Sequence, residues 1–102
     1  MLIARVTGNV WSTKKLDSLH ALRLLFVQPL DKNLEPSGEV MLAADEIGAG
    51  DKDLVIITRG APAMAALKRE KPVPVDAVVV GIIDSYDLFD EPKSGARSRK
   101  KA

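Results

Sequence analysis

Apolar and polar residues alternate near the start of the chain. Residues 2–11 place Ala4, Val6 and Gly8 on one face, with polar and mixed residues between them. An alternation with a period of two is typical of a β-strand whose two faces meet different surroundings. The pattern predicts a first strand here, and the polar, irregular residues 12–20 that follow predict a loop.

A second and a third strand are predicted on either side of a turn. Residues 23–30, RLLFVQPL, are mostly apolar and indicate a strand. Pro29 ends this strand or restricts it to a sheet edge, because proline has no N–H to donate to a neighbouring strand. Residues 31–38, DKNLEPSG, are dense in turn formers, so they predict a hairpin into a third strand at residues 39–44.

The second half of the chain predicts two more strands and one helix. Residues 53–58, DLVIIT, and residues 76–84, DAVVVGIID, are short and rich in β-branched side chains, which favours strands. Residues 61–70, APAMAALKRE, are the only good helix formers in a row, and a proline near the start suits the first helical turn. Residues 91–102, EPKSGARSRKKA, have the composition of a disordered tail.

These elements predict a mainly all-β fold in which five strands close into a small barrel. Closure removes the free strand edges that would otherwise pair with other chains. At 102 residues the chain has room for one domain. We expect a barrel with one short helix over residues 1–90 and a disordered basic tail over residues 91–102.

Two of the predicted strands are apolar on both faces. This holds for residues 53–58 and 77–83, whereas a strand in an isolated barrel is expected to show one face to water. Either the helix and the long loops cover the second face, or another subunit does. We favour the subunit, because one short helix covers only a small part of such a surface.

Composition excludes several classes of protein. There is no cysteine, so disulfides, cysteine nucleophiles and thiolate metal sites are all absent. No apolar run approaches the roughly 20 residues that a membrane helix needs, and the N-terminus does not resemble a signal peptide. We therefore expect a cytoplasmic protein without a membrane partner.

The net charge of +1 conceals a strong asymmetry along the chain. Residues 1–92 hold 10 basic and 14 acidic residues, so the body is mildly acidic. The tail that begins at Lys93 and ends at Ala102 is basic, and its charged residues are Lys93, Arg97, Arg99, Lys100 and Lys101. Such a tail either contacts an acidic surface or acts as a solubilising end.

The sequence IGAGDKDLVIITRG, residues 47–60, contains a GxG pattern that many nucleotide-binding loops share. A dinucleotide loop lies between a preceding strand and a helix whose N-terminus faces the phosphates. Here a strand follows, a third glycine is missing, and Asp51 and Asp53 would repel an anion. We therefore predict a tight turn in which the backbone approaches another part of the protein closely.

No set of side chains predicts an active site, a cofactor site or a metal site. His20 is the only histidine and lies in a polar stretch where no triad can be assembled. Asp84, Asp87 and Asp90 recur at every third position but lack the spacing of a calcium-binding loop. One alternative function stays open, namely a small barrel that binds nucleic acid through a strand face and the basic tail.

Four segments in order along the chain match one known pattern, and they are ARVTGNVWSTKK, RLLFVQPLD, AADEIGAGDKDLVIITRG and PVDAVVVGIID. Together they resemble the EutN/CcmL family, the vertex proteins of bacterial microcompartment shells, and the resemblance covers about residues 1–86. It implies a barrel of the oligonucleotide-binding (OB) type that forms a homopentamer without catalytic activity. Such pentamers fill the fivefold corners of a shell of hexagonal tiles, so hexameric shell proteins are the implied partners.

The resemblance also implies assembly residues. Gly48, Ala49 and Gly50 would form a compact loop near the axis of the ring, where a side chain repeated by symmetry would be crowded. The implied assembly strands hold Val27, Gln28, Pro29, Leu30, Asp31, Val75, Asp76, Val79 and Gly81. Residues 59–64, RGAPAM, depart from a polar and basic stretch found in relatives. The basic tail is additional to the family pattern; we favour an unstructured extension, and the alternative is a contact with cargo or another acidic surface.

Overall fold

The computed structural model describes most of the chain. The described residues are 1–10, 22–60, 63, 76–89 and 97–101, the last of these as backbone only. The predicted loop at residues 12–20 and almost all of the predicted helix at residues 61–70 lie outside this part. Ala63 alone represents that helix, and it is helical and buried. Among the described residues, no helix has the length and apolarity needed to span a bilayer.

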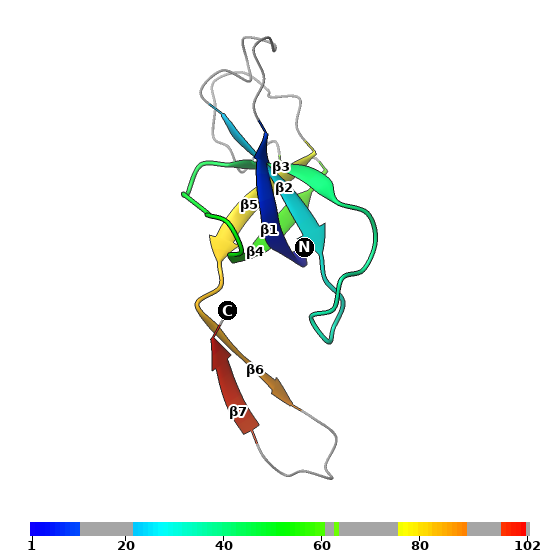
Figure 1. Ribbon diagram of the computed structural model, residues 1–102, viewed down its shortest axis with the longest axis vertical. Helices are drawn as coiled ribbons and strands as arrows, with labels where there is room; N and C mark the ends of the chain where they lie inside the picture. The colour runs from blue at the N-terminus through cyan, green and yellow to red at the C-terminus, as the bar shows by residue number, and fades with distance from the viewer. Residues whose placement is uncertain (11–21, 61–62, 64–75, 90–96, 102) are drawn as a thin grey trace.

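Five strands close into a barrel, as predicted (Figure 1). They are β1 (Leu2–Val10), β2 (Arg23–Pro29), β3 (Met41–Asp45), β4 (Leu54–Arg59) and β5 (Ala77–Ile82). The order around the barrel is β1-β2-β3-β5-β4, with β4 paired again to β1. Neighbours are antiparallel except β3 and β5, which run parallel where Ala44 meets Val78. The result is the OB-like barrel that the sequence predicts.

The interior of the barrel is filled by small and medium apolar side chains. Each interior strand position is followed by an outward-facing one, as the pleat requires. The interior residues, all at most 2% exposed, are Ala4, Val6, Leu25, Val27, Ala43, Val55, Ile57, Ala77 and Val79. Ala49, from the loop between β3 and β4, belongs to the same cluster. Alanine and valine predominate because a five-stranded barrel leaves little room inside.

A second apolar cluster lies on the outside of the barrel. Ala44 on β3 and Val78 on β5 pair with each other and pack with Leu22 and Ala63. Leu24 on β2 is half-buried against them. For this part of the wall, the cover comes from the chain itself, in the segment where the helix was predicted.

Two β-bulges interrupt the barrel strands. In β1, Val6 pairs with Val27 but Gly8 pairs with Phe26, so Thr7 is an extra residue. Phe26 points outward, because its neighbours Leu25 and Val27 both point into the barrel. Residues that are paired directly across two strands share a face, so Gly8 also lies on the outer face. The prediction that Gly8 shares the face of Ala4 and Val6 is therefore wrong, because the bulge exchanges the faces of the strand beyond it.

The second bulge lies in β5. Ile57 pairs with Val79 and Ile56 pairs with Gly81, so Val80 is the extra residue. Both bulges have the same arrangement: the extra residue is followed by a glycine, and this glycine lies opposite a large apolar side chain on the neighbouring strand. A Cβ on Gly8 would lie 3.4 Å from Phe26 Cδ2, and one on Gly81 would lie 3.5 Å from Ile56 Cδ1. The glycines let these two side chains lie close to the barrel wall.

A separate hairpin extends from the barrel (Figure 1). Strand β6 (Ser85–Phe89) pairs antiparallel with β7 (Arg97–Lys101), and neither is paired with a barrel strand. The expectation of a tail without regular structure is therefore wrong for Arg97–Lys101. That expectation came from side-chain composition, whereas a strand ladder is made by backbone groups of any residue except proline. The boundary predicted between residues 90 and 91 stays a prediction.

Candidate assembly surfaces

The glycine loop is organised by one buried carboxylate. Asp45, the last residue of β3, is 3% exposed. Its side chain accepts hydrogen bonds from the backbone N–H groups of Ile47 at 3.2 Å, Gly48 at 3.2 Å and Ala49 at 2.9 Å. Asp53 completes the series, because its carboxylate accepts the N–H of Gly50 at 2.8 Å. Four consecutive N–H groups are thus satisfied inside the chain, so the loop offers no cradle for a phosphate.

Arg23, the first residue of β2, connects this loop to two strands. Its guanidinium donates to Asp45 Oδ2 at 3.3 Å, to the carbonyl oxygen of Ala49, and to Asn9 Oδ1 at 3.3 Å. Neither Arg23 nor Asp45 was a predicted site residue. A signal was present in the sequence, because an aspartate just before a glycine turn often accepts the N–H two residues further on.

The loop then folds back onto β1. Val6 donates its N–H to the carbonyl oxygen of Asp53 and accepts the N–H of Lys52, both at 2.9 Å. Arg5 donates from its side chain to the Lys52 carbonyl oxygen at 2.7 Å. The prediction of a tight turn with a close backbone approach is confirmed, and the partner is the first strand of the same chain.

The three predicted loop residues have different surroundings. Ala49 is fully buried in the barrel core, and a Cβ on Gly50 would lie 3.7 Å from Asp53 Oδ2. Gly48 has a φ of +94°, and no atom lies within 4 Å of the place where its Cβ would be. Gly48 and the half-exposed Ile47 therefore form the open side of the loop. A role in assembly stays a prediction for this loop.

Some predicted assembly residues act inside the subunit. Val27 and Val79 point into the barrel and are at most 2% exposed. Their side chains therefore stabilise the barrel core and do not form part of its outer surface. Gln28 donates to the carbonyl oxygens of Pro29 and Gly38, at 3.0 and 3.1 Å, and so connects β2 to the following turn.

Asp31 and Leu30 shape the same turn. The Asp31 carboxylate accepts the N–H groups of Asn33 at 2.8 Å and Glu35 at 3.0 Å, which is the geometry of an Asx turn. Leu30 forms an isolated bridge with Pro36. The predicted hairpin between the second and third strands is confirmed by the antiparallel pairing of β2 and β3.

Asp76 and Gly81 lie on or beside β5. Asp76 is exposed, and its carbonyl oxygen accepts the N–H of Gly60 at 2.9 Å. Gly81 lies on the outer face at the second bulge. Val75 lies outside the described residues.

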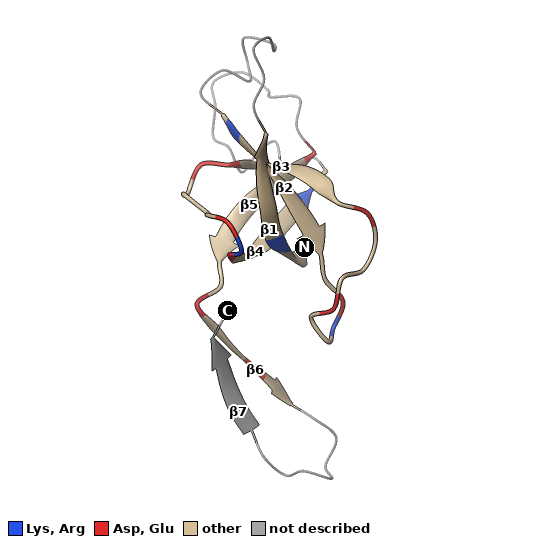
Figure 2. Ribbon diagram, viewed as in Figure 1, with Lys and Arg blue, Asp and Glu red and all other residues tan. Residues whose placement is uncertain are grey.

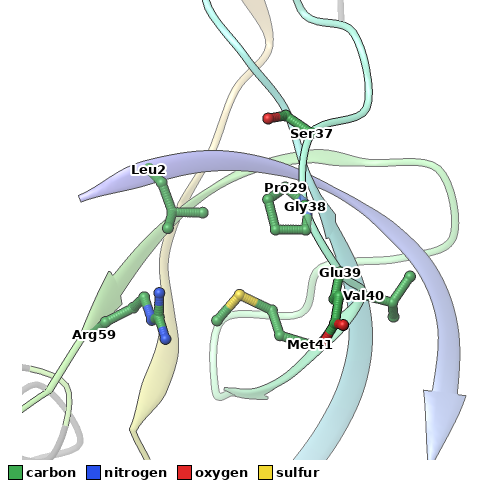
Figure 3. Close-up of a pocket in the computed structure, with 8 residues that line it drawn as sticks. All are labelled: Leu2, Pro29, Ser37, Gly38, Glu39, Val40, Met41 and Arg59. Atoms are coloured by element: carbon green, nitrogen blue, oxygen red, sulfur yellow. The ribbon is translucent and has the colours of Figure 1, made fainter.

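A hollow of about 400 Å³ opens at one end of the barrel (Figure 3). Its lining comes from strand ends and from the turn before β3, and consists of Leu2, Pro29, Ser37, Gly38, Glu39, Val40, Met41 and Arg59. Figure 3 shows the Arg59 side chain directed toward Met41, below Leu2 and Pro29. Of these residues the sequence predicted only Pro29 as a site residue. The lining is mixed, with apolar side chains beside one carboxylate and one guanidinium.

Two rows of outward-facing apolar residues cross the barrel wall. The Phe26 row, comprising Gly8, Phe26 and Leu42, runs over β1, β2 and β3, with Phe26 41% and Leu42 47% exposed. The Ile56 row, comprising Ile3, Ile56 and the bulge residue Val80, runs over β1, β4 and β5; Ile3 pairs with Ile56, and Ile56 pairs with Gly81, the residue after Val80. In that row Ile3 is 36% and Val80 40% exposed. Aligned cross-strand pairs of this kind form continuous apolar strips.

Among the residues that the structure describes, charged groups do not gather into one face (Figure 2). Among the described residues outside β7, ten carboxylates stand against five cations. In the described part of the chain, no three histidine, aspartate or glutamate side chains lie close enough to hold a metal ion. The described part of the body therefore presents no basic surface of the kind that binds nucleic acid by its phosphates.

The arrangement can be compared with known proteins. The family model for the ethanolamine utilisation protein EutN and carboxysome proteins, EutN_CcmL, matches residues 1–84. The chain belongs to the EutN/CcmL family. The match covers the whole barrel and ends before β6.

Several relatives of this EutN/CcmL chain are similar over nearly their full length. The carboxysome shell vertex protein CcmL of Gloeobacter violaceus is 39% identical over 92 residues, which cover 90% of this chain and 91% of that protein. The microcompartment shell vertex protein GrpN of Rhodospirillum rubrum is 37% identical over 90 residues, covering 88% of this chain and all of GrpN. EutN of Escherichia coli, also a shell vertex protein, is 38% identical over 84 residues, covering 82% and 87%.

Solved structures of these proteins share the fold. The structure of G. violaceus CcmL superposes with a TM-score of 0.79 at 40% identity, covering 86% of this chain and 90% of that one. The structure of R. rubrum GrpN, described as a pentameric microcompartment shell protein, has a TM-score of 0.76 at 34% identity, covering 88% and 100%. None of the relatives named here is described as binding nucleic acid, so that alternative receives no support.

Proposed function

We propose that this chain forms the pentameric vertex of a bacterial microcompartment shell. One observation carries the proposal. The R. rubrum GrpN structure is described as pentameric, and this chain matches GrpN over its entire length at 37% identity in sequence. The same barrel and the same family model connect it to the CcmL and EutN vertex proteins.

A vertex protein of this kind acts through its shape. A closed shell of hexagonal tiles needs fivefold corners, and a ring of five identical subunits fills such a corner. The partners are therefore four further copies of the chain and the surrounding hexameric shell proteins. Its location is the shell of a microcompartment in the bacterial cytoplasm.

The function requires no catalysis. In the described part of the chain, no set of side chains can hold a metal ion. Three charged groups are buried or half-buried around the glycine loop, namely the carboxylates of Asp45 and Asp53 and the guanidinium of Arg23. All three form hydrogen bonds that hold this loop. We infer that the protein is structural.

The C-terminal segment has a separate proposed role. Residues 93–102 lie beyond the family match and carry five positive charges. We expect this segment to contact cargo or another acidic surface of the shell interior, through contacts that weaken as salt is added.

Light scattering of the purified full-length chain at moderate salt tests the ring. Five chains of 11.0 kDa correspond to a mass of about 55 kDa. That mass is the expected result, and a stable monomer would contradict the proposal. A second experiment mixes the chain with purified hexameric shell protein. Closed particles in electron micrographs are expected only in the mixture, with hexameric protein alone as the control.

A further inference from the structure

The outer wall of the barrel is unusually poor in charge for this chain. Overall 28% of residues are charged, yet the outward positions in the middle of β2, β3, β4 and β5 are uncharged. These positions include Phe26, Gln28 and Leu42 on one side, and Ile56, Thr58 and Val80 on the other. Depletion of charge with an aromatic residue at the centre is typical of the core of a protein interface.

The two apolar rows lie on opposite sides of β1. Strand β1 is flanked by β2 and β4 in the barrel (Figure 1), so the Phe26 row extends in one direction around the wall and the Ile56 row in the other. The rows also differ in shape. Phe26 and Leu42 project as a prominent aromatic and aliphatic pair, whereas Ile56 is half-buried against Gly81.

A ring with fivefold symmetry requires this kind of asymmetry. In a twofold dimer one patch binds its own copy, but in a ring each subunit binds its neighbours through two different patches. A chain that forms a closed ring therefore needs two complementary surfaces at different places on the barrel. Two such surfaces are available on the barrel wall, because the Phe26 row and the Ile56 row are both exposed and lie at different places on it.

We propose that the Phe26 row of one subunit packs on the Ile56 row of the next subunit. The inference rests on the ring assembly proposed above and names the surfaces that build it. Phe26 is the central anchor, held against the barrel by Gly8, and the shallow surface around Ile56 and Val80 receives it. Gly81 keeps that surface shallow by leaving Ile56 close to the wall.

Two exposed positions allow a complementation test. Leu42→Lys disables the Phe26 row and Val80→Lys disables the Ile56 row, because each places a charge in an apolar contact. Both residues are at least 40% exposed in the subunit, so the subunit keeps its fold. Asn33→Lys, at an exposed position in the turn before β3, is the matched control for charge.

Light scattering gives a distinct expected mass for each sample. Wild type and N33K have five-subunit masses, whereas L42K and V80K alone each fall fivefold to the monomer. An equimolar mixture of L42K and V80K forms a dimer, because one intact Phe26 row and one intact Ile56 row remain to pair. Circular dichroism checks that each variant is folded. If a lysine variant is unfolded, the milder change Leu42→Gln or Val80→Gln at the same position replaces it.

The other outcomes overturn the proposal in distinguishable ways. A five-subunit mass for L42K or V80K beside a five-subunit wild type shows that the rows are not the interface, and leaves the vertex function untouched. Two monomeric variants that do not combine show that the rows do not pair with each other. A monomeric wild type overturns both this inference and the proposed function.

Discussion

At the end of β3, the Asp45 carboxylate holds three consecutive N–H groups of the glycine loop together with Arg23. Composition counts this residue among the acidic groups of the body, which are normally solvated. Its burial shows a structural role instead, because a buried carboxylate is stable only when donors surround it. The loop that resembles a nucleotide-binding turn is therefore shaped by the protein's own anion.

Asp45→Ala is expected to lower the free energy of unfolding by about 3 kcal/mol, since several donors lose their acceptor at once. Asp45→Asn, which keeps one oxygen, should cost about 1–2 kcal/mol. Urea unfolding at one fixed protein concentration measures both. Asp51→Ala, an exposed change in the same loop, is the control and should stay within about 0.5 kcal/mol of wild type. Equal stabilities for D45A and D51A would contradict the role of Asp45.

The two glycines of the loop should respond differently to alanine. Gly48 has a φ of +94°, so Gly48→Ala should cost about 1–3 kcal/mol of subunit stability even though open space surrounds it. Gly50→Ala should be close to neutral, because its Cβ would make an ordinary contact at 3.7 Å with Asp53. Thermal unfolding compares the two. A loss of ring mass in G50A with unchanged subunit stability would assign the predicted assembly role to this loop.

At the scale of elements, the two bulges have the largest effect on the barrel wall. Each inserts one residue and places a glycine under a large apolar side chain, at Gly8 beneath Phe26 and at Gly81 beside Ile56. A bulge exchanges the faces of the strand that follows, which a regular alternation does not reveal. The orientation of both apolar rows depends on these two irregularities.

Gly8→Val is expected to displace the Phe26 ring, because even a Cβ at this position would lie 3.4 Å from it. The added methyl groups should cost about 1–3 kcal/mol of unfolding free energy. Thr7→Val, on the adjacent residue of the same bulge, is the control; it removes only a long, exposed hydrogen bond of 3.4 Å from Thr7 Oγ1 to the Phe26 carbonyl oxygen, so it should change the unfolding free energy far less. Chemical denaturation of the two variants side by side checks this. If G8V matches T7V, Phe26 does not lie against the barrel as described.

At the scale of the whole molecule, the barrel and the β6–β7 hairpin are separate sheets. No barrel strand depends on β7 for its hydrogen bonds, and a two-stranded hairpin adds little stability of its own. The family match also ends before β6. The hairpin is therefore an addition to a barrel that is complete without it.

Deletion of residues 93–102, which removes β7, should leave the barrel's unfolding free energy within about 0.5 kcal/mol of wild type. The mass of the ring should also be unchanged. Differential scanning calorimetry and light scattering measure the two properties. A collapse of the ring to monomers would show instead that the C-terminal segment contributes to the contacts between subunits.

Most of the strands were predictable because their pattern is local. The periods of residues 2–11 and 23–30, and the turn formers of residues 31–38, depend only on neighbours along the chain. The doubly apolar strands predicted cover on the outer wall; around Val78 that cover is Leu22 and Ala63 of the same chain, and cover by a second subunit stays a prediction. Strands β6 and β7 were both missed, because their pairing with each other is non-local and independent of side-chain composition.

The sequence by itself determined the five barrel strands, the absence of thiol and disulfide chemistry, and the family. These properties follow from residue identity and short-range order, which remain the same however the chain folds. Only the tertiary structure decided which residues Asp45 and Arg23 hold, which face Gly8 lies on, and where the two apolar rows run. Those properties depend on strand register and on contacts between segments far apart in the chain, and a single inserted residue in a strand is enough to change them.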